Sequence, residues 1–416
     1  MTRRDSGYEL FGQQQFRNVW TANLVFNLGL VMLNLGVAWT MTSLTDSPIL
    51  VSMVQTASSL PFILFAIPLG IATDSVGHRR MMIVSQVWML AVTGLLAVIA
   101  LSGGWNLTPR LLLFAMFLLG VGVVVQQSSW KPFLYELVSK DKIIAALSFN
   151  SLSSDIGRAA GPAIGGYLMG YFGTAVVLFT STLSHLYMIV VVKTTGAKTT
   201  GAETTGAETT GGDRTADPDA SRSLRQGWRL LRGSPNLYGP IMRTAMVMVT
   251  CGAVLGLLPL EAKENIQTGP IGYGGLLAAL GIGSAIGAAL TPILRRHIRL
   301  AWLSAAAIVI LGLAAIGISQ WDSMVLDASF LLFYGCAWSI VTITHLSSVQ
   351  IASPEDMRGL MTAIYALAVQ GSMAAGSFGF GLAAQHIGVS RAILIAGIFA
   401  LSSLLFIRRF PVTEGL

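Results

Sequence analysis

Charged side chains are scarce in this sequence. Only 11% of its 416 residues are Asp, Glu, Lys or Arg, whereas 53% are hydrophobic. Soluble domains carry roughly 25% charged residues. So few charges cannot cover a water-facing surface, which excludes a soluble domain and favours a chain that lies mainly in lipid.

Three further absences narrow the function. Cys251 and Cys336 are the two cysteines, and both fall in apolar runs, so we expect no disulfide framework. No phosphate-binding loop ends in Gly-Lys-Ser/Thr, and no His/Cys cluster has the spacing of metal ligands. We therefore expect no enzyme, no ATP-driven machine, no metal site and no cofactor. Residues 1–15 are polar and the first apolar run is long enough to remain as a span, so we expect no removable signal peptide.

Apolar runs of about 20 residues, the length that spans a bilayer, fill most of the chain. Helix is the expected state, because an open sheet edge in lipid would leave backbone groups unpaired. The predicted fold is an all-α membrane protein with twelve transmembrane helices in two pseudo-symmetric six-helix halves. The runs lie near residues 18–42, 50–72, 81–103, 111–130, 145–169, 173–192, 238–260, 271–293, 301–319, 325–348, 360–383 and 391–408.

Basic residues alternate between the loops. Of the 26 Lys and Arg residues, 22 fall in one set of loops, three (Arg110, Lys263 and Arg391) fall in the other, and Arg158 lies inside a span. The positive-inside rule predicts that the rich set, and with it both termini, lies in the cytoplasm. The net charge of +7 is then explained by a membrane face, so we expect no nucleic-acid partner.

A low-complexity linker separates the predicted halves. Residues 194–212 repeat Thr-Thr-Gly-Ala plus a charged residue, a composition that cannot build a core and predicts a disordered tether. Residues 221–236 follow, with an apolar face and a basic face that predict a short amphipathic helix on the anionic inner leaflet. The apolar face holds Leu224, Trp228 and Leu231, and the basic face holds Arg225, Arg229 and Arg232. The predicted organisation is a six-helix bundle over 1–193, a linker over 194–236 and a second bundle over 237–416.

The two halves resemble each other in sequence. Residues 128–136 and 347–355 both begin with Ser-Ser at the same end of the fourth run of their half. Each is followed by a Gly-rich run, with Gly157, Gly161 and Gly165 in one and Gly371, Gly376 and Gly379 in the other. Duplicated halves with a substrate site at their interface are a transporter architecture.

The loop after the second run carries a spaced motif. Its members are Gly70, Asp74, Gly77, Arg79 and Arg80. This pattern resembles the signature loop of the major facilitator superfamily, with Ser75 and His78 at two positions that are usually basic. The resemblance implies that Asp74 lies near the positive N-terminal end of the eleventh span and holds the cytoplasmic gate shut. The alternative is that the loop only anchors the chain at the interface.

The fifth span reads GRAAGPAIGG and resembles the antiporter signature of the same superfamily, which is associated with exporters. Three of its glycines lie on one helix face and allow a neighbouring backbone to approach, and its proline bends the helix. The motif residues are Gly157, Gly161, Pro162, Gly165 and Gly166. A generic tight-packing helix is the alternative.

The resemblance extends over nearly the whole chain. Residues 130–166 and 257–290 resemble the enterobactin-exporter-like branch, which also includes macrolide and multidrug efflux proteins. It implies a monomeric, multi-pass transporter of the bacterial inner membrane that exports a siderophore, antibiotic or other natural product. With no ATP site, protons would supply the energy. The alternatives are a facilitator that works in uptake and a non-transporting sensor or scaffold on the same fold.

Polar residues within the spans are the candidate sites, because ionisable groups in lipid are costly. Asp155 and Arg158 lie mid-span, one helical turn apart, and are either a proton switch or a structural ion pair. His345 is a further proton candidate. Neutral polar residues either bind substrate or join helices; they are Asn23, Asn27, Asn34, Gln126, Gln127 and Gln370.

Overall fold

A computed structural model describes residues 9–103, 107–195, 227 and 229–406, without the side chains of Asp74, Asp356 and Phe406. Within these ranges the regular secondary structure is entirely helical, which confirms the predicted class. Six long helices form the first half of the chain: α2 (Gln14–Leu44), α3 (Pro48–Val76), α4 (His78–Leu101), α5 (Pro109–Leu137), α6 (Ile143–Phe172) and α7 (Thr174–Thr194). Six more follow: α9 (Pro235–Leu260), α10 (Pro270–Leu294), α11 (Leu300–Ile318), α12 (Met324–Ala352), α13 (Arg358–Ile387) and α14 (Val389–Ser402).

Ten of these helices are long and apolar enough to cross a membrane. The more polar α6 and the shorter α14 complete the set. The helices run past the predicted apolar stretches, as where α5 continues to Leu137, because a helix can extend from hydrocarbon into the polar interface. At its C-terminal end α9 passes into one π-helical turn, η2 (Glu261–Asn265).

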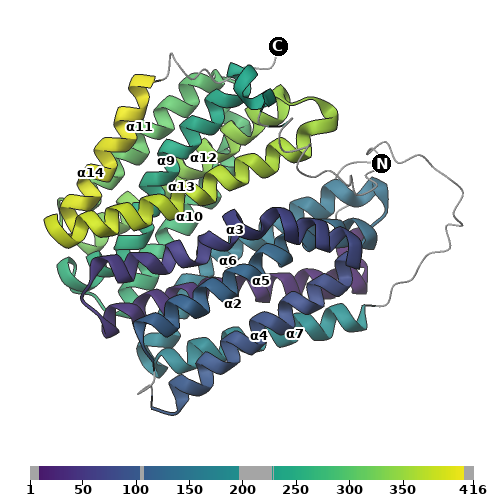
Figure 1. Ribbon diagram of the computed structural model, residues 1–416, viewed down its shortest axis with the longest axis horizontal. Coiled ribbons are helices and arrows are strands. Elements are labelled where there is room, and N and C mark those ends of the chain that lie inside the picture. Colours follow the sequence, from purple (N-terminus) through teal and green to yellow (C-terminus); the bar gives the residue numbers. More distant parts are fainter. Residues whose placement is uncertain (1–8, 104–106, 196–226, 228, 407–416) are drawn as a thin grey trace, which may run out of the picture.

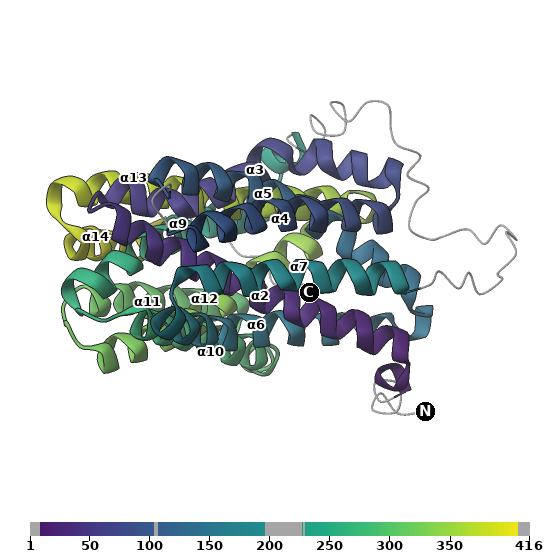
Figure 2. The same cartoon turned by 90° about the horizontal axis from the view of Figure 1, so that it is seen from below.

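The helices form two groups, α2 to α7 and α9 to α14 (Figure 1). Seen from a second side, the long helices run in one general direction (Figure 2). Because the turns are short, consecutive helices reverse direction, and the loops collect at two ends. We call the end with Arg79, Lys193 and Arg295 the basic end, and the end with Asp46 and Lys263 the opposite end.

Glycine brings the first and fifth helix of each group together. A Cβ built on Gly157 of α6 would lie 2.8 Å from the Cβ of Asn27 on α2. In the second group, a Cβ on Gly376 of α13 would lie 2.0 Å from the carbonyl oxygen of Val249 on α9. Such backbone contact supplies packing that the hydrophobic effect cannot supply in lipid, and its repetition extends the sequence symmetry into the structure.

The two groups meet through a matched pair of crossings, α6 with α10 and α13 with α3. A Cβ on Gly281 of α10 would lie 2.1 Å from the carbonyl oxygen of Arg158, so the backbones touch there. Trp39 of α2 stacks on Tyr273 of α10, with ring centroids 5.6 Å apart. The Gly281 contact lies at the middle of both helices, and the Trp39 contact lies toward the opposite end. Gly70, near the basic end of α3, has nothing within 4 Å of a built Cβ.

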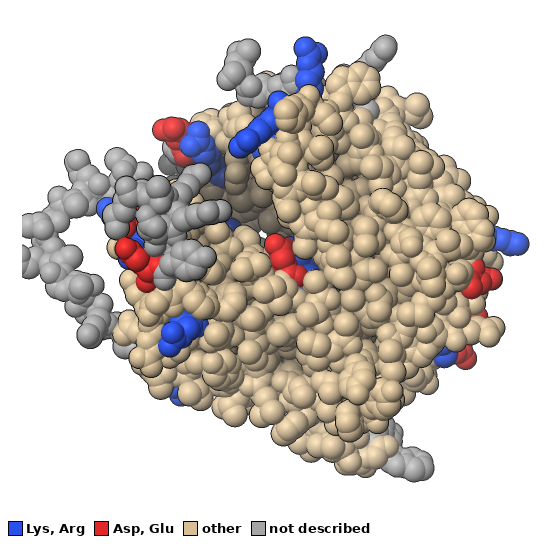
Figure 3. All heavy atoms as spheres, turned by 180° about the vertical axis from the view of Figure 1, so that it is seen from behind, with Lys and Arg blue, Asp and Glu red and all other residues tan. Residues whose placement is uncertain are grey.

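The groups are therefore closed against each other at the opposite end and part toward the basic end. Figure 3 shows one face of the molecule, with most charged side chains near its edges and a few in a hollow near its middle.

Most of the predicted linker, including residues 196–212 of the repeat, lies outside the described residues, so the domain boundaries stay a prediction. The end of the amphipathic segment is described. Leu231 is 2% exposed and packs in a cluster with Met361 of α13, whereas Arg229 and Arg232 are exposed. Leu231 of the predicted apolar face thus packs on the second group, whereas Leu224 and Trp228 lie outside the described residues and the contact with the inner leaflet stays a prediction.

Candidate functional site

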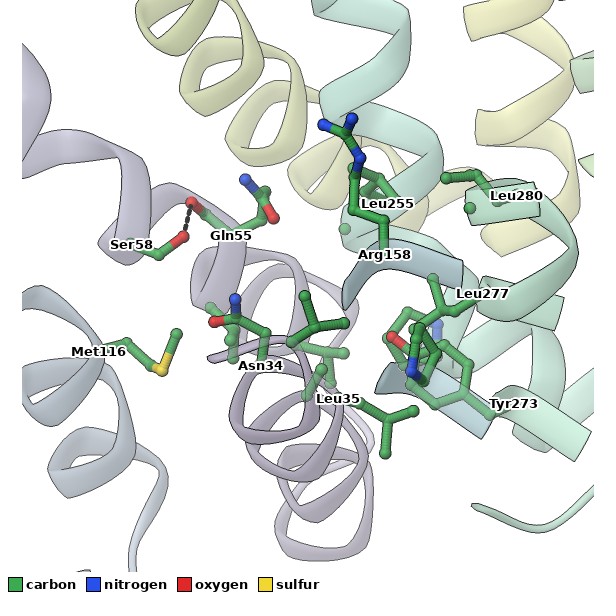
Figure 4. A pocket seen from close by; sticks show the side chains of 18 of the residues that line it. Asn34, Leu35, Gln55, Ser58, Met116, Arg158, Leu255, Tyr273, Leu277 and Leu280 are labelled. Carbon is green, nitrogen blue, oxygen red and sulfur yellow. Dashed lines mark hydrogen bonds between the residues drawn. The ribbon is translucent and has the colours of Figure 1, made fainter. Parts of the chain in front are cut away.

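A cavity of about 210 Å³ lies between the two groups, at the centre of the molecule. Asn34, Gln55 and Ser58 line it from the first group, and Arg158 adds a charge from α6. Apolar side chains such as Tyr273, Leu277 and Trp338 form the wall contributed by the second group. Figure 4 shows Asn34 and Gln55 extending into this space from neighbouring helices. The cavity is mainly apolar with a few convergent polar groups, which is typical of a small-molecule site.

A second cavity, of about 310 Å³, lies in the first group on the basic-end side of the first. The two cavities follow each other along α2 and α6, since Asn27 and Ser154 line one while Asn34 and Arg158 line the other. Asn23, Gln126 and Gln127 also line the second cavity. The predicted polar face of α2 is thus shared between two adjoining spaces.

Some of these amides are already engaged between helices. Asn23 Nδ2 donates to Ser153 Oγ at 3.0 Å, and Asn27 Nδ2 donates to the same oxygen at 3.2 Å. Asn34 and Gln127 are exposed to the cavities, and Gln370 is half-buried on α13. Asn34 and Gln127 are therefore better placed to meet a substrate than Asn23, which is 4% exposed.

Asp155 and Arg158 form an ion pair on the cavity side of α6. Arg158 Nη2 lies 2.5 Å from Asp155 Oδ1, and the two side chains are 52% and 24% exposed, respectively. Because both reach the open space, neither charge is enclosed in the protein. Arg158 can therefore meet a polar or charged solute in the cavity.

Gln126 and His345 occupy matched positions, each two residues before the Ser-Ser of its half. Gln126 Oε1 accepts from Gln86 Nε2 at 3.0 Å and from Ser85 at 3.3 Å. His345 Nε2 lies 2.7 Å from Ser304 Oγ. In each half, a polar residue of the fourth helix is thus joined to a serine of the third.

His345 is fully buried inside the second group. Its Nδ1 lies 2.8 Å from the hydroxyl oxygen of Thr244, and the neighbouring Arg243 donates to Ser304 Oγ at 3.2 Å. His345 is not among the side chains that line the two cavities described above. Its hydrogen bonds hold α9, α11 and α12 together.

The predicted gating loop is seen in part. Gly77 links α3 to α4 with φ of +95°, a backbone conformation that favours glycine. Arg79 donates to the carbonyl oxygens of Val192 and Lys193 at 3.2 and 3.0 Å, so it caps the end of α7 within the first group. Arg80 is exposed. The side chain of Asp74 lies outside the described part, and its gating role stays a prediction.

The glycine motif of α6 serves two interfaces. Gly157, Gly161 and Gly165 face α2, as the spacing predicts. Gly166 faces the other group instead, where a Cβ would lie 2.6 Å from the carbonyl oxygen of Pro270. The carbonyl oxygen of Pro162 meets Gly274. The motif therefore places α6 against both a neighbour in its own group and α10 across the interface.

Three buried charged residues are absent from the candidate sites predicted from the sequence. Among the acidic residues that prediction singles out Asp155, and it counts Arg243 among the basic loop residues. Glu261 is 1% exposed, Asp327 is 0% exposed and Arg243 is 1% exposed. The signal was present for Asp327, because it lies inside the apolar run at 325–348. Hydropathy averages over a run and so hides a single buried charge.

Comparison with known proteins identifies the fold. Residues 5–415 match the protein family described as transmembrane secretion effector. Macrolide efflux protein A of Streptococcus pyogenes is 19% identical over 391 residues, which cover 92% of both chains.

Solved structures of transporters superpose over nearly the full chain. A bacterial homologue of the human lysosomal transporter Spinster, inward-facing and unoccupied, has a TM-score of 0.72 at 12% identity, covering 96% of this chain and 98% of that one. A D-xylose-proton symporter has a TM-score of 0.72 at 14% identity, covering 96% and 97%. An auto-inhibited peptide transporter of the POT family has a TM-score of 0.76 at 11% identity, covering 97% and 98%.

Proposed function

We propose that this chain, which belongs to the transmembrane secretion effector family of the major facilitator superfamily, is a proton-driven exporter of a small amphipathic compound. The observation that carries the proposal is the central cavity between two helix groups that close at one end only. Such a site, reached alternately from either side as the groups rock, is the basis of alternating access.

The cavity lining supports an amphipathic substrate. Tyr273, Leu277 and Trp338 offer apolar and aromatic surface, while Asn34 and Gln55 offer hydrogen bonds. The cavity volume of about 210 Å³ is below the roughly 300–1,000 Å³ usual for drug-sized ligands. We infer that the substrate also occupies the adjoining space beside Asn27 and Gln127. A macrolide-like or siderophore-like natural product has the required mixture of polar and apolar groups.

We place the basic end in the cytoplasm, following the positive-inside rule. The conformation described here is then open to the cytoplasm, which is the state in which an exporter collects its substrate. Export also agrees with the glycine motif of α6 and with the efflux function named for the streptococcal relative. Protons are the proposed energy source, and one charge moved through ~150 mV supplies roughly 3.5 kcal/mol.

Transport in inverted membrane vesicles tests the proposal. We expect vesicles that contain the protein to accumulate a labelled macrolide when their interior is acidified, and to lose it when a protonophore collapses the gradient. A siderophore and a cationic dye, added in turn as competitors, identify the substrate class. Loss of the solute from preloaded vesicles would indicate uptake, and no proton-dependent flux of any probe would favour a sensor or scaffold.

The Asp155–Arg158 pair gives a second prediction. Since both side chains are partly exposed, the pair contributes about 0–1 kcal/mol to stability, so Asp155→Asn and Arg158→Gln should each reach the membrane at wild-type levels. We expect Asp155→Asn to lose proton-driven accumulation and to keep downhill exchange, because it removes the carboxyl group that we propose as the proton carrier beside Arg158. Vesicle transport measures both. Full proton-driven export by the double variant would remove Asp155 from the mechanism.

A further inference from the structure

Two carboxyl groups are enclosed in the second group, at the opposite end. Glu261 is the first residue of η2, and Asp327 lies in the first turn of α12. Both oxygens of Asp327 are buried without a hydrogen-bond partner in the described structure. Glu261 has partners, since Asn265 Nδ2 donates to Oε2 at 2.8 Å and Ser390 of α14 donates at 3.2 Å.

The charged groups around this pair do not neutralise it. Asp327 is within electrostatic range of Glu261 and of Asp322, and Glu261 is within range of Asp322 and Glu264. The nearby cations are directed elsewhere: Arg391 is exposed on α14, and Lys263 contacts the first group. Two buried carboxylates without a cation repel each other, and the arrangement is relieved when they share one proton.

A metal ion is a poorer occupant. In the described ranges, no three His, Cys, Asp or Glu side chains come together as candidate metal ligands. Ca²⁺ takes six to eight oxygen ligands, more than the two carboxyl groups, Asn265 and Ser390 supply by themselves.

The same short π turn touches the first group. Lys263 Nζ donates to the carbonyl oxygen of Thr42 in the last turn of α2, and lies 3.5 Å from Asp46 Oδ1. Glu261 and Lys263 are two residues apart within η2, so a shift of the turn moves both. Isolated π turns inside α-helices occur frequently at functional sites.

We propose that Glu261 and Asp327 form a proton-binding site, and that taking up one proton from the opposite end is a condition for closing that end. The inference rests on the proposed proton-driven transport and adds, besides Asp155, a second site at which a proton acts. When the opposite end is open, water can hydrate both carboxylates. Closure buries them, which requires that a proton from the medium bind one of the two carboxylates, so that a single negative charge is enclosed. η2 then sets Lys263 against Thr42.

The test uses the full chain and no substrate, so that it stands even if the transported compound is misidentified. Spin labels are attached to cysteines at Ser43 on α2 and Gln320 beyond α11, in a background without Cys251 and Cys336. The distance between the labels is measured from about pH 5 to pH 9. We expect the ratio of the short-distance (closed) to the long-distance (open) population to fall at least ~fivefold as the pH rises.

Asp327→Asn and Glu261→Gln are the test variants, because a neutral amide imitates the protonated acid. Each should keep the mostly closed distance distribution of low pH at every pH and should lose proton-driven accumulation. Asp322→Asn is the control, because it removes a nearby exposed carboxyl group and should keep the wild-type pH response. A wild-type distance that does not change with pH, or an unaltered pH response in both test variants, would overturn the site. If the vesicles transport none of the probes but the distance between the labels changes with pH as expected, the proposed substrate is wrong and the proton-binding site is still supported.

Discussion

Gly281→Ala should lower export at least ~tenfold while the protein still folds and reaches the membrane. The added Cβ would lie 2.1 Å from the carbonyl oxygen of Arg158, and backbone atoms on α6 cannot yield as a flexible side chain can. The clash is between the two groups and not inside one. The variant is therefore expected to separate α6 from α10, which destabilises only the conformation closed at the opposite end.

The size of the effect follows from the cost of overpacking. A forced contact of this kind costs about 1–3 kcal/mol, which reduces the population of the closed state by roughly 5- to 150-fold. Vesicle transport measures the loss, and spin labels at Ser43 and Gln320 measure the opening.

Gly275→Ala on the same helix is the matched control. Its Cβ would lie 3.4 Å from the Cε of Met324, an ordinary contact with a flexible side chain. We expect wild-type transport from this variant. Gly252→Ala supplies the opposite contrast, since its Cβ would lie 2.0 Å from the carbonyl oxygen of Met373 within the second group. That clash should reduce the amount of folded protein. Wild-type export by Gly281→Ala would show that the α6–α10 crossing does not limit the cycle.

These contrasts show what sequence could and could not provide. The number of helices follows from the apolar runs, because these express the contact of each segment with lipid. The predicted side of the membrane on which each loop lies follows from the basic residues. Gly281 and Gly275 look alike in the sequence, yet only Gly281 meets another backbone. Which glycine matters depends on how two helices cross, and crossing is a property of tertiary packing that no single segment contains.

The candidate site shows the same limit. The sequence leaves open whether Asn34 and His345 face a cavity or a neighbouring helix; Asn34 lines the central cavity, whereas His345 lies buried against Thr244 and Ser304. Periodicity places a residue on a face of its own helix but does not say whether that face meets a cavity or a neighbour. The acidic pair of Glu261 and Asp327 joins segments more than 60 residues apart, so no local pattern could have paired them.

Gly70→Trp should have the effect opposite to that of Gly281→Ala: it should prevent closure of the basic end and so hold the molecule open there. We expect export to fall at least ~tenfold. Along α3, Thr56 donates to the carbonyl oxygen of Ala374 on α13, and Ile63 lies 3.6 Å from a Cβ built on Gly371. Gly70 follows at the same seven-residue spacing, which drifts only ~20° per step and keeps it on the same helix face. It lies beyond the point where α3 and α13 separate.

This placement explains why a large side chain at Gly70 is harmless in one conformation and excluded from the other. Nothing lies within 4 Å of a built Cβ in the structure described here, so an indole can be accommodated without strain. When the basic end closes, α13 must approach this face of α3, and the indole would occupy the space that the backbone needs. Ile71→Trp is the control, because Ile71 is 46% exposed on a different face of α3 and the same bulk should leave transport unchanged.

The measurements are vesicle transport and the distance between spin labels at the basic ends of α3 and α13. Normal closure at that end in Gly70→Trp would show that α13 does not approach this face and would contradict a rocking motion about the two crossings.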